Sequence, residues 1–358
     1  MKKIVLTGGG TAGHVTPNIA LLPALQAAGY EIAYVGSYEG IEKKLIADFN
    51  IPYTGISTGK FRRYLDPKNF SDPFRVMKGF VEARNYLKNY QPDVVFSKGG
   101  FVSVPVVRAA ASLHIPCIIH ESDMTPGLGN KLCSPVAEKV CCNFPETMKN
   151  IPADKAVLTG SPIRAELAEG SKLAGLNMCG FTANKPVIMV IGGSLGAANV
   201  NKAVRDALPK LLEDFQVVHL CGKDKIDNLL LNTPGYKQFE YIKAELKDIF
   251  AMADIVISRA GANAICELLA LKKPNILIPL PAASSRGDQL LNAASFEAQG
   301  YSIVLNEDDI TTNLLVDKVH ELYFNRQNYV DAMSKSHQMD AVKTIMELIN
   351  AAADKKTN

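Results

Sequence analysis

A glycine-rich segment near the start of the chain, residues 8–14 (GGGTAGH), constrains its fold more than any other stretch. A short apolar run at 4–6 precedes this segment, and apolar residues at helical spacing follow it over 19–25. The pattern predicts a strand, a glycine turn and a helix, whose N-terminus presents unpaired N–H groups and a positive dipole end to an anion, usually a phosphate. A tight turn that binds no ligand is the alternative interpretation.

The spacing of Gly8, Gly10 and Gly13 also matches the dinucleotide-binding fingerprint. That fingerprint requires an acidic residue about 20 positions further on, at the tip of the second strand, where it binds the ribose. The expected second strand, 32–35, has no carboxylate at its tip, because Glu39 comes only later. The sequence therefore disfavours a nicotinamide or flavin site.

A second segment of the same kind lies in the other half of the chain. The continuous apolar, β-branched run at 187–191 is typical of a buried parallel strand, and it ends in GGSLGA at 192–197. A helical pattern follows over 200–211. Two such openings in a chain of 358 residues predict two similar α/β domains, with a boundary near 160–162.

The composition favours a soluble protein of a reducing compartment. Apolar residues make up 47% of the chain, which is enough for two cores, and the seven cysteines, an odd number without a C-x-x-C pair, favour reduced thiols in a cytosol. We expect no signal peptide, because a strand and the glycine loop follow Met1 almost at once, and no apolar run of about 18 residues that would span a membrane. The net charge of +3 is too small to argue for a nucleic-acid partner.

Polar loops follow the next expected strands of the first half. Runs typical of strands at 93–96 and 116–120 lead into SKGGF at 97–101 and ESDMTPG at 121–127. Ligands of open parallel sheets bind beyond the carboxyl ends of the strands, so we expect these two loops and the first glycine loop to share one edge of a sheet. The second half repeats the order, with strands expected at 217–221, 254–258 and 275–279.

The segment 259–267 (RAGANAICE) follows one of these strands and opens a helix. Gly261 and Asn263 expose helix N–H groups. Glu267 lies about one turn into the helix, where its carboxylate could accept two hydrogen bonds from a vicinal diol such as a ribose. An ordinary solvated glutamate on an amphipathic helix is the alternative. A proline-rich turn at 279–281 then leads to the polar residues 284–289.

Seven segments of the chain, which span most of its length in one order, carry a family resemblance: GGGTAGHVTP (8–17), GGFVSVP (99–105), HESDMTPGLGN (120–130), GSPIR (160–164), GGSLGA (192–197), SRAGANAICE (258–267) and DQLLNA (288–293). The chain resembles the MurG family, the N-acetylglucosaminyltransferases that convert lipid I to lipid II in bacterial peptidoglycan synthesis. The resemblance implies the GT-B fold, an α/β architecture of two Rossmann-like domains with parallel sheets facing across a cleft. It also implies UDP-N-acetylglucosamine as the donor, inversion at the anomeric carbon, and the C4 hydroxyl of the N-acetylmuramoyl unit of lipid I as the acceptor.

The resemblance further implies how the chain is divided. An N-terminal domain, facing acceptor and membrane, would comprise 1–161 together with a returning C-terminal segment, 338–358. A UDP-sugar donor-binding domain would comprise 162–337. From the pattern alone, the last helical stretch, 341–352, could pack on either domain.

Most donor contacts implied by the resemblance belong to the second domain. Ser194 and the N–H groups of Leu195 and Gly196 would hold the diphosphate, and the backbone of 244–246 would lie near the uracil. Glu267 would hold the ribose diol, and Gln289 with Asp288 would bind the sugar hydroxyls. The other implied donor contacts are Thr11, Ala12 and Gly13 of the first domain, with Arg164, Gly261, Ala262 and Asn263.

The reaction needs a base for the acceptor hydroxyl and fixed donors for the negative charge that develops on the leaving diphosphate. The candidates for the base are His14, whose unperturbed pKa of about 6.5 suits the task, and Asp123, with Glu121 behind them. A structural loop histidine is the alternative for His14. Asp123 stands where some family members carry asparagine, which leaves the donor contact at this position open. No Asp-x-Asp follows an apolar strand, so we expect neither a metal nor a cofactor.

A polyprenyl diphosphate acceptor requires contact with a membrane, and basic and aromatic residues interleave with few acids over 60–80. Such a surface suits an anionic leaflet and a lipid diphosphate, whereas a solvated loop and an ordinary amphipathic helix are the alternative. We expect peripheral association with the cytoplasmic face of the membrane through anionic inner-leaflet lipids. The predicted acceptor and membrane residues are Gly99, Gly100, Phe61, Arg62, Arg63, Phe74 and Arg75.

Two other kinds of function stay open on the sequence. The chain could be a different UDP-sugar enzyme of the GT-B fold, such as a diacylglycerol glycosyltransferase or a UDP-N-acetylglucosamine 2-epimerase. It could also be a non-catalytic sensor of nucleotide sugars.

Overall fold

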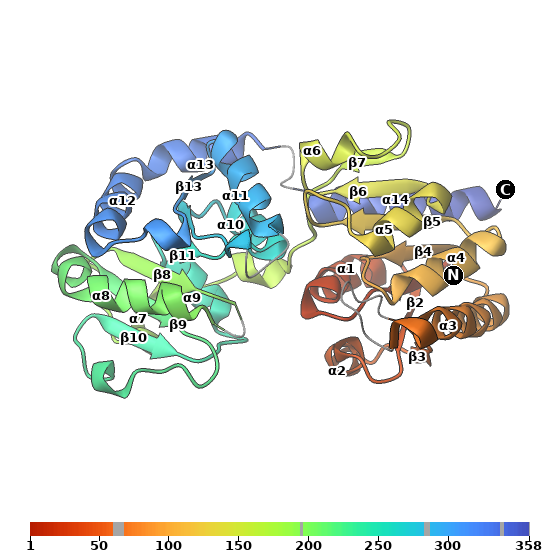
Figure 1. The fold of residues 1–358 in the computed structure, drawn as a ribbon, viewed down its shortest axis with the longest axis horizontal. Helices are drawn as coiled ribbons and strands as arrows, with labels where there is room; N and C mark the ends of the chain where they lie inside the picture. Colours follow the sequence, from red (N-terminus) through yellow and green to blue (C-terminus); the bar gives the residue numbers. More distant parts are fainter. Residues whose placement is uncertain (60–67, 194–195, 283–286, 337–339, 358) are drawn as a thin grey trace. The chain divides into compact units, whose positions relative to one another are not determined.

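The computed structural model describes residues 1–59, 68–193, 196–282, 287–336 and 340–357 of the chain. The chain divides into two compact units, Met1–Arg164 with Asp340–Asn358, and Ala165–Met339 (Figure 1). Each unit contains one parallel β-sheet with helices on its faces. The expected α/β fold with two parallel-sheet domains is therefore confirmed.

The sheet of the first unit has seven strands in the order β3-β2-β1-β4-β5-β6-β7. Ile4 in β1 lies opposite Ile32 in β2 and Val94 in β4, and all the pairings are parallel. Most of these strands are apolar runs, as expected for strands that are buried on both faces. Their bounds are β1 Lys3–Thr7, β2 Glu31–Ser37, β3 Tyr53–Ile56, β4 Val94–Ser97, β5 Cys117–Glu121, β6 Lys139–Cys142 and β7 Ala156–Leu158.

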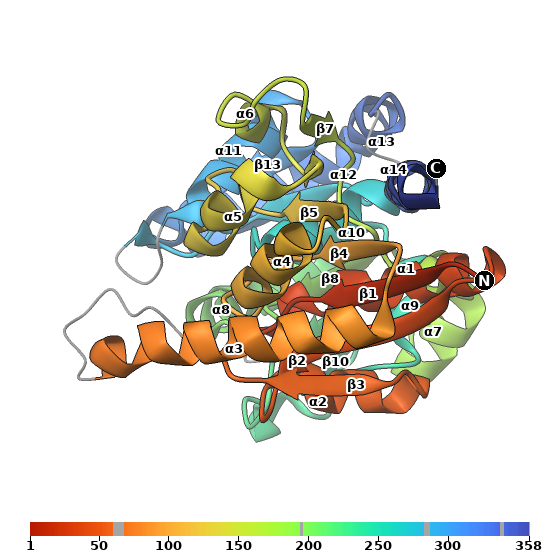
Figure 2. The ribbon, with the colours of Figure 1, turned by 90° about the vertical axis from the view of Figure 1, so that its right-hand side faces the viewer.

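Successive side chains of a strand point to opposite faces of the sheet, and this alternation builds two cores in the first unit. Ile4 and Leu6 pack on one face with helices α1 and α14, whereas Val5 packs on the other face with α3 and α4. Figure 2 shows α3 and α4 side by side on that second face. The helices of this unit are η1 Ala12–His14, α1 Thr16–Ala27, α2 Ile41–Ile46, η2 Ala47–Phe49, α3 Lys68–Tyr90, α4 Ser103–Ser112, α5 Leu128–Cys133, η3 Ser134–Val136, α6 Pro145–Met148 and α14 Ala341–Thr357.

The C-terminal helix α14 belongs to the first unit, although it is far from it in sequence. Ile345, Ile349 and Ala353 are buried against the core that contains Ile4 and Leu6. This packing assigns α14 to the first unit, whereas the helical pattern alone allowed it to pack on either domain.

The sheet of the second unit has six parallel strands in the order β10-β9-β8-β11-β12-β13. Its core joins β8, β9, β11 and β12 to the apolar faces of α8 and α12. The strands are β8 Val187–Ile191, β9 Gln216–Leu220, β10 Tyr236–Phe239, β11 Ile255–Ser258, β12 Asn275–Leu277 and β13 Ser302–Val304. The helices are η4 Ala165–Ala168, α7 Lys172–Cys179, α8 Ala198–Asp214, η5 Asn228–Leu230, α9 Leu246–Met252, α10 Ala262–Ala270, α11 Asp288–Ala298, η7 Glu307–Asp309, α12 Thr312–Phe324 and α13 Arg326–Ser334.

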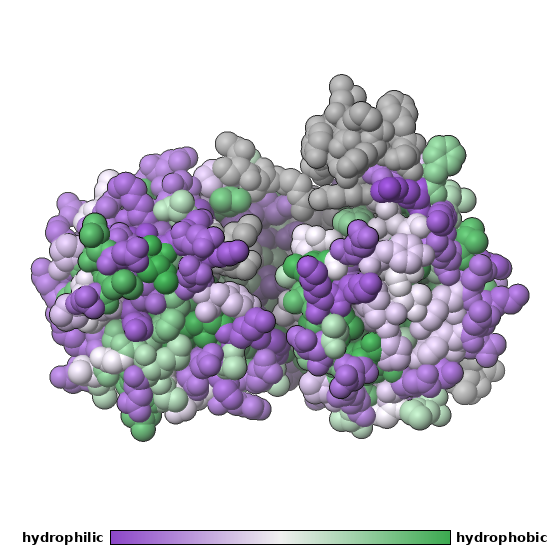
Figure 3. Space-filling view, turned by 90° about the horizontal axis from the view of Figure 1, so that it is seen from below, coloured by the Kyte–Doolittle hydropathy of each residue, from purple (hydrophilic) through white to green (hydrophobic). Residues whose placement is uncertain are grey.

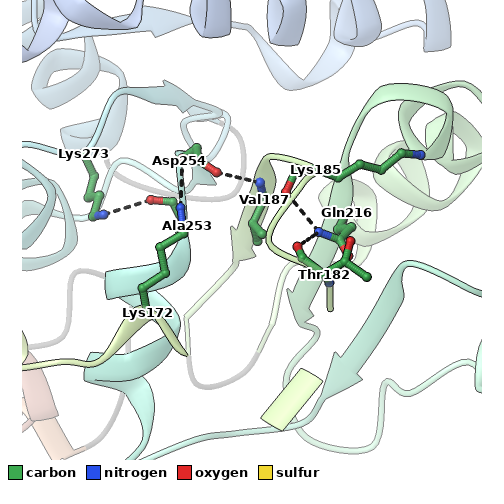
Figure 4. Close-up of polar contacts among 8 residues, drawn as sticks. All are labelled: Lys172, Thr182, Lys185, Val187, Gln216, Ala253, Asp254 and Lys273. Atoms are coloured by element: carbon green, nitrogen blue, oxygen red, sulfur yellow. Dashed lines mark hydrogen bonds and ion pairs between the residues drawn. The ribbon is translucent and has the colours of Figure 1, made fainter. Parts of the chain in front are cut away.

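Polar side chains at the amino end of this second sheet serve the fold. Asp254 accepts a hydrogen bond from Val187 N at 2.8 Å, and Gln216 Nε2 donates to Thr182 O at 2.9 Å (Figure 4). Lys273 Nζ donates to Ala253 O at 2.8 Å, and burial lowers the pKa of this lysine. These groups tie loops to strand starts, so the chemistry of this unit is to be sought at the opposite, carboxyl edge.

The strands expected from the sequence are present, with ends shifted by no more than two residues. The helix expected over 19–25 begins earlier than the apolar pattern, at Thr16, and the 3₁₀ turn Ala12–His14 lies between it and the glycines. All seven cysteines are free and buried. Among the residues that the structure describes, no helix is both long and apolar enough to cross a membrane.

Candidate active site

Three loops of the first unit meet beyond the carboxyl ends of β1, β4 and β5, as the sequence predicts. These loops contact one another at glycine residues. A Cβ on Gly100 would collide with Gly9 O, a Cβ on Gly10 would collide with the Phe101 ring, and one on Gly129 would lie 2.9 Å from Gly100 O. Gly10 and Gly100 have φ values of +86° and +83°, a region that disfavours side chains. Gly100 therefore packs against the backbone of Gly9, and Gly10 packs against the Phe101 ring.

His14 lies on the first of these loops, and its ring is held by a neighbour. Thr11 Oγ1 lies 2.9 Å from His14 Nδ1, and a Cβ on Gly100 would lie 3.2 Å from the same nitrogen. When Nδ1 carries the proton and donates to Thr11, Nε2 is the nitrogen that can accept a proton from a substrate. The arrangement is compatible with the base predicted for His14.

Glu121 is buried at the end of β5, where its carboxylate organises the loop that follows. Oε1 accepts a hydrogen bond from Asp123 N at 3.0 Å, and Oε2 accepts from Gly127 N and from Asn130 Nδ2, both at 2.9 Å. These contacts favour a positioning role for Glu121. Its role as a base stays a prediction.

Asp123 is half-buried on the loop that Glu121 organises. Its backbone is held at both ends, because its N–H donates to Glu121 and its carbonyl accepts from Thr147 Oγ1 at 3.2 Å. These contacts fix the backbone that carries the carboxylate. The role of Asp123 as a base stays a prediction, beside that of His14.

Two buried cationic or titratable groups at this edge had no role in the sequence analysis. Lys98 follows β4 and donates a hydrogen bond to Ser122 Oγ, and His120 Nε2 lies 2.9 Å from Gly160 O. Burial, with the Lys98 charge, holds the pKa of His120 well below its usual value, so this imidazole stays neutral. The lysine at the tip of an apolar strand was the signal available in the sequence. Glu42, which accepts a hydrogen bond from Gly10 N in the first glycine loop, had no comparable signal in the sequence.

In the second unit, the loop after β8 is described only in part. Ser194 and Leu195, the predicted diphosphate contacts, lie outside the described residues. Gly196 has a φ of +68°, and a Cβ there would collide with Cys221 O. This loop therefore approaches the end of β9 as closely as a glycine allows.

The predicted ribose contact, Glu267, lies on α10, whose N-cap is Gly261 and whose first residue is Ala262. Glu267 is half-buried, as is Asn263 near the start of the helix. Burial of this degree distinguishes Glu267 from a freely solvated glutamate. The contact itself stays a prediction.

Gln289 lies in the first turn of α11, directly after Asp288. Its side-chain oxygen accepts a hydrogen bond from Leu280 N at 3.0 Å. The amide oxygen is therefore occupied with the loop after β12, and the NH₂ group is the part of Gln289 that suits a sugar hydroxyl.

Arg259 ties together the loops that carry these residues, a role that the sequence analysis missed. Its Nη1 donates to Ile278 O at 3.1 Å and to Pro279 O at 3.2 Å, and its guanidinium forms a largely buried ion pair with Glu307. Asn292 Nδ2 adds a hydrogen bond to Ala260 O at 3.2 Å. Arg164, predicted among the donor contacts of 162–337, is the last residue of the first unit before the chain enters the second.

Helix α3 carries an apolar stripe on its outer side. Phe74, Met77 and Val81 are 78%, 62% and 52% exposed. At 3.6 residues per turn, Lys78 and Arg84 lie on either side of this stripe. Figure 3 shows that hydrophobic side chains (green) reach the surface among hydrophilic ones (purple) on the face of the first unit seen from below. The predicted Arg75 is also exposed, whereas Phe61, Arg62 and Arg63 lie outside the described residues.

The described residues contain no group of three or more His, Cys, Asp or Glu side chains that could hold a metal ion. The cations Lys98 and Arg259 at the carboxyl edges are each engaged within their own unit, Lys98 with Ser122 and Arg259 with Glu307. Treatment with EDTA tests whether the reaction needs a metal.

Comparison with known proteins agrees with this geometry. The chain matches the N-terminal domain of glycosyltransferase family 28 over residues 4–142 and its C-terminal domain over 187–349. A relative from Lachnospira eligens is 65% identical over 349 residues, which cover 98% of this chain and 99% of the relative. That relative is named UDP-N-acetylglucosamine–N-acetylmuramyl-(pentapeptide) pyrophosphoryl-undecaprenol N-acetylglucosamine transferase.

Solved structures extend the comparison. MurG from Acinetobacter baumannii matches with a TM-score of 0.78 at 28% identity, over 98% of this chain and 100% of that one. A UDP-GlcNAc 2-epimerase from Neisseria meningitidis matches with a TM-score of 0.66 at 15% identity, over 97% of this chain and 99% of that one. The second likeness is one of fold alone.

Proposed function

The chain belongs to glycosyltransferase family 28 and, within it, to the MurG family, and on this premise we propose that it transfers N-acetylglucosamine from UDP-N-acetylglucosamine to lipid I. The acceptor group is the C4 hydroxyl of the N-acetylmuramoyl unit, and the product is lipid II. The observation that carries the proposal is the 65% identity, over nearly the full length of both chains, to a transferase of this name. The same identity is the reason for placing this reaction in peptidoglycan synthesis.

The chain's own residues divide the chemistry between the two units. In the first unit, the loops around Gly9, Gly100 and Glu121 would receive the acceptor, and His14 or Asp123 would take the proton of its hydroxyl. In the second unit, the loops that Arg259 ties together would receive the donor. Thr11, Ala12 and Gly13 stay predicted donor contacts from the first unit.

In the donor site, we assign the ribose diol to Glu267 and a sugar hydroxyl to the NH₂ group of Gln289. The leaving diphosphate would be stabilised by backbone N–H groups of the loop after β8. Fixed donors aimed at the charge that develops in the transition state are a large term in catalysis, because they need no reorganisation during the reaction. A general base in addition contributes about 10²–10⁴-fold.

Incubation of the protein with labelled UDP-N-acetylglucosamine, with and without lipid I, tests this function. We expect label to appear in a disaccharide lipid only when lipid I is present. Formation of UDP-N-acetylmannosamine, or of N-acetylmannosamine together with UDP, would support an epimerase, transfer to diacylglycerol another transferase, and binding without turnover a sensor. Any of these three results without transfer to lipid I would overturn the proposal.

We also propose that α3 docks the first unit on the cytoplasmic face of the membrane, where the lipid acceptor resides. The apolar stripe of Phe74, Met77 and Val81 would enter the interface, and Lys78 and Arg84 beside it would face anionic headgroups. Each basic residue near an anionic surface contributes about 1 kcal/mol, and salt screens this term within a Debye length of about 8–10 Å. The apolar contribution does not depend on salt in this way.

Charge reversal on α3 tests this docking. Lys78→Glu with Arg84→Glu should weaken binding to anionic vesicles at low salt by at least about tenfold, because two attractions become repulsions. A matched control reverses Lys44 and Lys343, which are exposed on the elements of the other sheet face. Both variants should bind UDP-N-acetylglucosamine like the parent. If they also sediment equally with anionic vesicles, α3 is only a solvated helix face.

A further inference from the structure

Glu42 is a fully buried carboxylate behind the first glycine loop. It lies in the first turn of α2 and has an exposed fraction of 0%. An unpaired buried charge is costly, so a carboxylate in such a position must be satisfied by donors. The groups that donate hydrogen bonds to Glu42 therefore indicate its role.

The two oxygens of Glu42 join two loops of the sheet edge. Oε2 accepts a hydrogen bond from Gly10 N at 3.2 Å, 32 positions away in the sequence. Oε1 accepts from Ser37 N at 2.9 Å and from Ser37 Oγ at 2.5 Å. Glu42 thus connects the loop after β1 to the end of β2.

The surrounding backbone makes room for this carboxylate at three separate glycines. A Cβ on Gly9 would lie 2.5 Å from the carboxyl carbon of Glu42, and a Cβ on Gly36 would lie 2.8 Å from its Cγ. A Cβ on Gly40 would collide with Oε1. Side chains essentially never approach so closely, so each of these positions depends on being glycine while Glu42 stays where it is.

Two tyrosines complete the support of this edge. Tyr34 OH donates to Gly8 O at 2.7 Å, and Tyr53 OH donates to Ser37 O at 2.5 Å. Burial, with the nearby Glu42 charge, raises the pKa of both tyrosines, so both hydroxyls stay protonated as donors. The backbone of the first glycine loop is therefore held at Gly8 by Tyr34 and at Gly10 by Glu42.

From this geometry we propose that Glu42 is a positioning residue for transfer, acting through the backbone of Gly10 on the Thr11–His14 pair. Gly10 has a φ of +86° and no side chain, so little else in its own structure fixes the direction of the chain that leads to Thr11. The hydrogen bond from Gly10 N to Glu42 supplies that restraint. The proposal rests on the proposed function, in which His14 takes the proton of the acceptor hydroxyl.

Glu42→Gln tests the proposal, because the amide keeps the shape but turns one acceptor oxygen into a donor. A misplacement of about 1 Å at a catalytic group costs about 10²-fold, so we expect kcat to fall by about 10–100-fold. The dissociation constant of UDP-N-acetylglucosamine, measured by calorimetry, should change much less than kcat, because most of the predicted donor contacts belong to the other unit and only Thr11, Ala12 and Gly13 to this one.

Asp93→Asn is the matched control. Asp93 accepts a hydrogen bond from Lys3 N at 2.6 Å, so it binds a backbone N–H at the opposite end of the same strand, β1. This variant should lower the unfolding temperature but leave kcat within about twofold. Equal losses of kcat in Glu42→Gln and Asp93→Asn would reduce Glu42 to a purely structural role and overturn the proposal, as would an unchanged kcat in Glu42→Gln.

A double variant separates this proposal from the proposed function. If Glu42 acts through His14, Glu42→Gln should lower kcat by less than about twofold in a His14→Ala background, since the group it positions is gone. A full additional loss in that background would overturn the proposal. If His14→Ala alone keeps the parent kcat, the assignment of the base is wrong, and the positioning proposal falls with it. If His14→Ala is inactive while Glu42→Gln is fully active, only the positioning proposal fails.

A second variant covers the case in which Glu42→Gln does not fold. Ser37→Ala removes the hydroxyl that binds Glu42 Oε1 but leaves the carboxylate and its bond to Gly10 N. We expect a severalfold fall in kcat with a small change in unfolding temperature. An unchanged kcat in Ser37→Ala would then count against the proposal.

Discussion

Replacement of Glu121 by glutamine should destabilise the first unit through the loop 121–130. In the native protein its carboxylate, only 5% exposed, accepts three hydrogen bonds, from Asp123 N, Gly127 N and Asn130 Nδ2. Glutamine has one acceptor oxygen. If this oxygen takes the place of Oε2, it keeps the bonds to Gly127 and Asn130, but the NH₂ group then faces the N–H of Asp123.

The magnitude follows from these contacts. Hydrogen bonds to charged groups contribute about 1.5–3 kcal/mol each and neutral ones about 0.5–1.5 kcal/mol. One charge-assisted bond is lost and two become neutral, so the free energy of unfolding should fall by about 3.5–6 kcal/mol. For a domain of about 150–250 residues, each kcal/mol shifts the midpoint by about 2–4 °C, which predicts a shift of about 7–24 °C.

Calorimetry of the intact protein measures this shift, and hydrogen exchange locates it. The amides of Asp123 and Gly127 should exchange faster in Glu121→Gln than in the parent. Glu31→Gln is the control, because the side chain of Glu31 is exposed and its partners, Lys3 at 3.9 Å and Tyr90, lie at the surface. Surface pairs of this kind contribute little, so that variant should unfold within about 0.5 kcal/mol of the parent.

Glu121→Gln also decides whether Glu121 positions the loop that follows it or takes the proton of the acceptor hydroxyl. A midpoint within 1 °C of the parent, together with unchanged exchange in the loop 121–130, would refute the reasoning from the three hydrogen bonds. If kcat then fell by about 10²–10⁴-fold without loss of stability, Glu121 would be the base.

Three further predictions concern the second unit and the reaction as a whole. Glu267→Ala should weaken UDP-N-acetylglucosamine binding by about 1–3 kcal/mol in calorimetry, the cost of unmade hydrogen bonds in a half-buried polar site, and unchanged affinity would remove Glu267 from the ribose contact. Protein treated with EDTA should keep most of its transferase rate in metal-free buffer, whereas complete loss restored by magnesium or manganese would reveal a metal requirement. Burial between Tyr236 and Asn201 lowers the pKa of His219 to about 3, below its value of about 6.5 in an unfolded chain. Its stabilising effect is therefore complete above pH 6.5 and is lost as the pH falls toward 3, about 2 kcal/mol by pH 5; denaturant titrations should show this loss in the parent and a flatter profile in His219→Gln.

The sequence by itself determined the strands, the glycine loops and the edge at which they meet. β8 was predicted to the residue, because a continuous apolar, β-branched run is a local signal of a strand buried on both faces. The three loops after β1, β4 and β5 were predicted to share an edge, because parallel strands end on the same side. The family motifs added the candidate residues on these loops, such as His14 and Glu267.

Only the tertiary structure decided what the buried polar side chains do. Glu121 stood in a motif as a candidate base. Two of its donors, Asp123 and Gly127, lie on a loop whose path no periodicity describes, and the third lies in α5. Arg259 stood in another motif without a role, until the loop after β12 and Glu307 came within reach of its guanidinium. Glu42 is 32 positions from the N–H that it binds, and the helical pattern could not assign α14 to either unit. Strand periodicity and glycine conformation are properties of neighbouring residues, and so they can be read along the chain. The partner of a buried charge depends on which distant loops the packed sheet brings together, and that is decided only when the chain has folded.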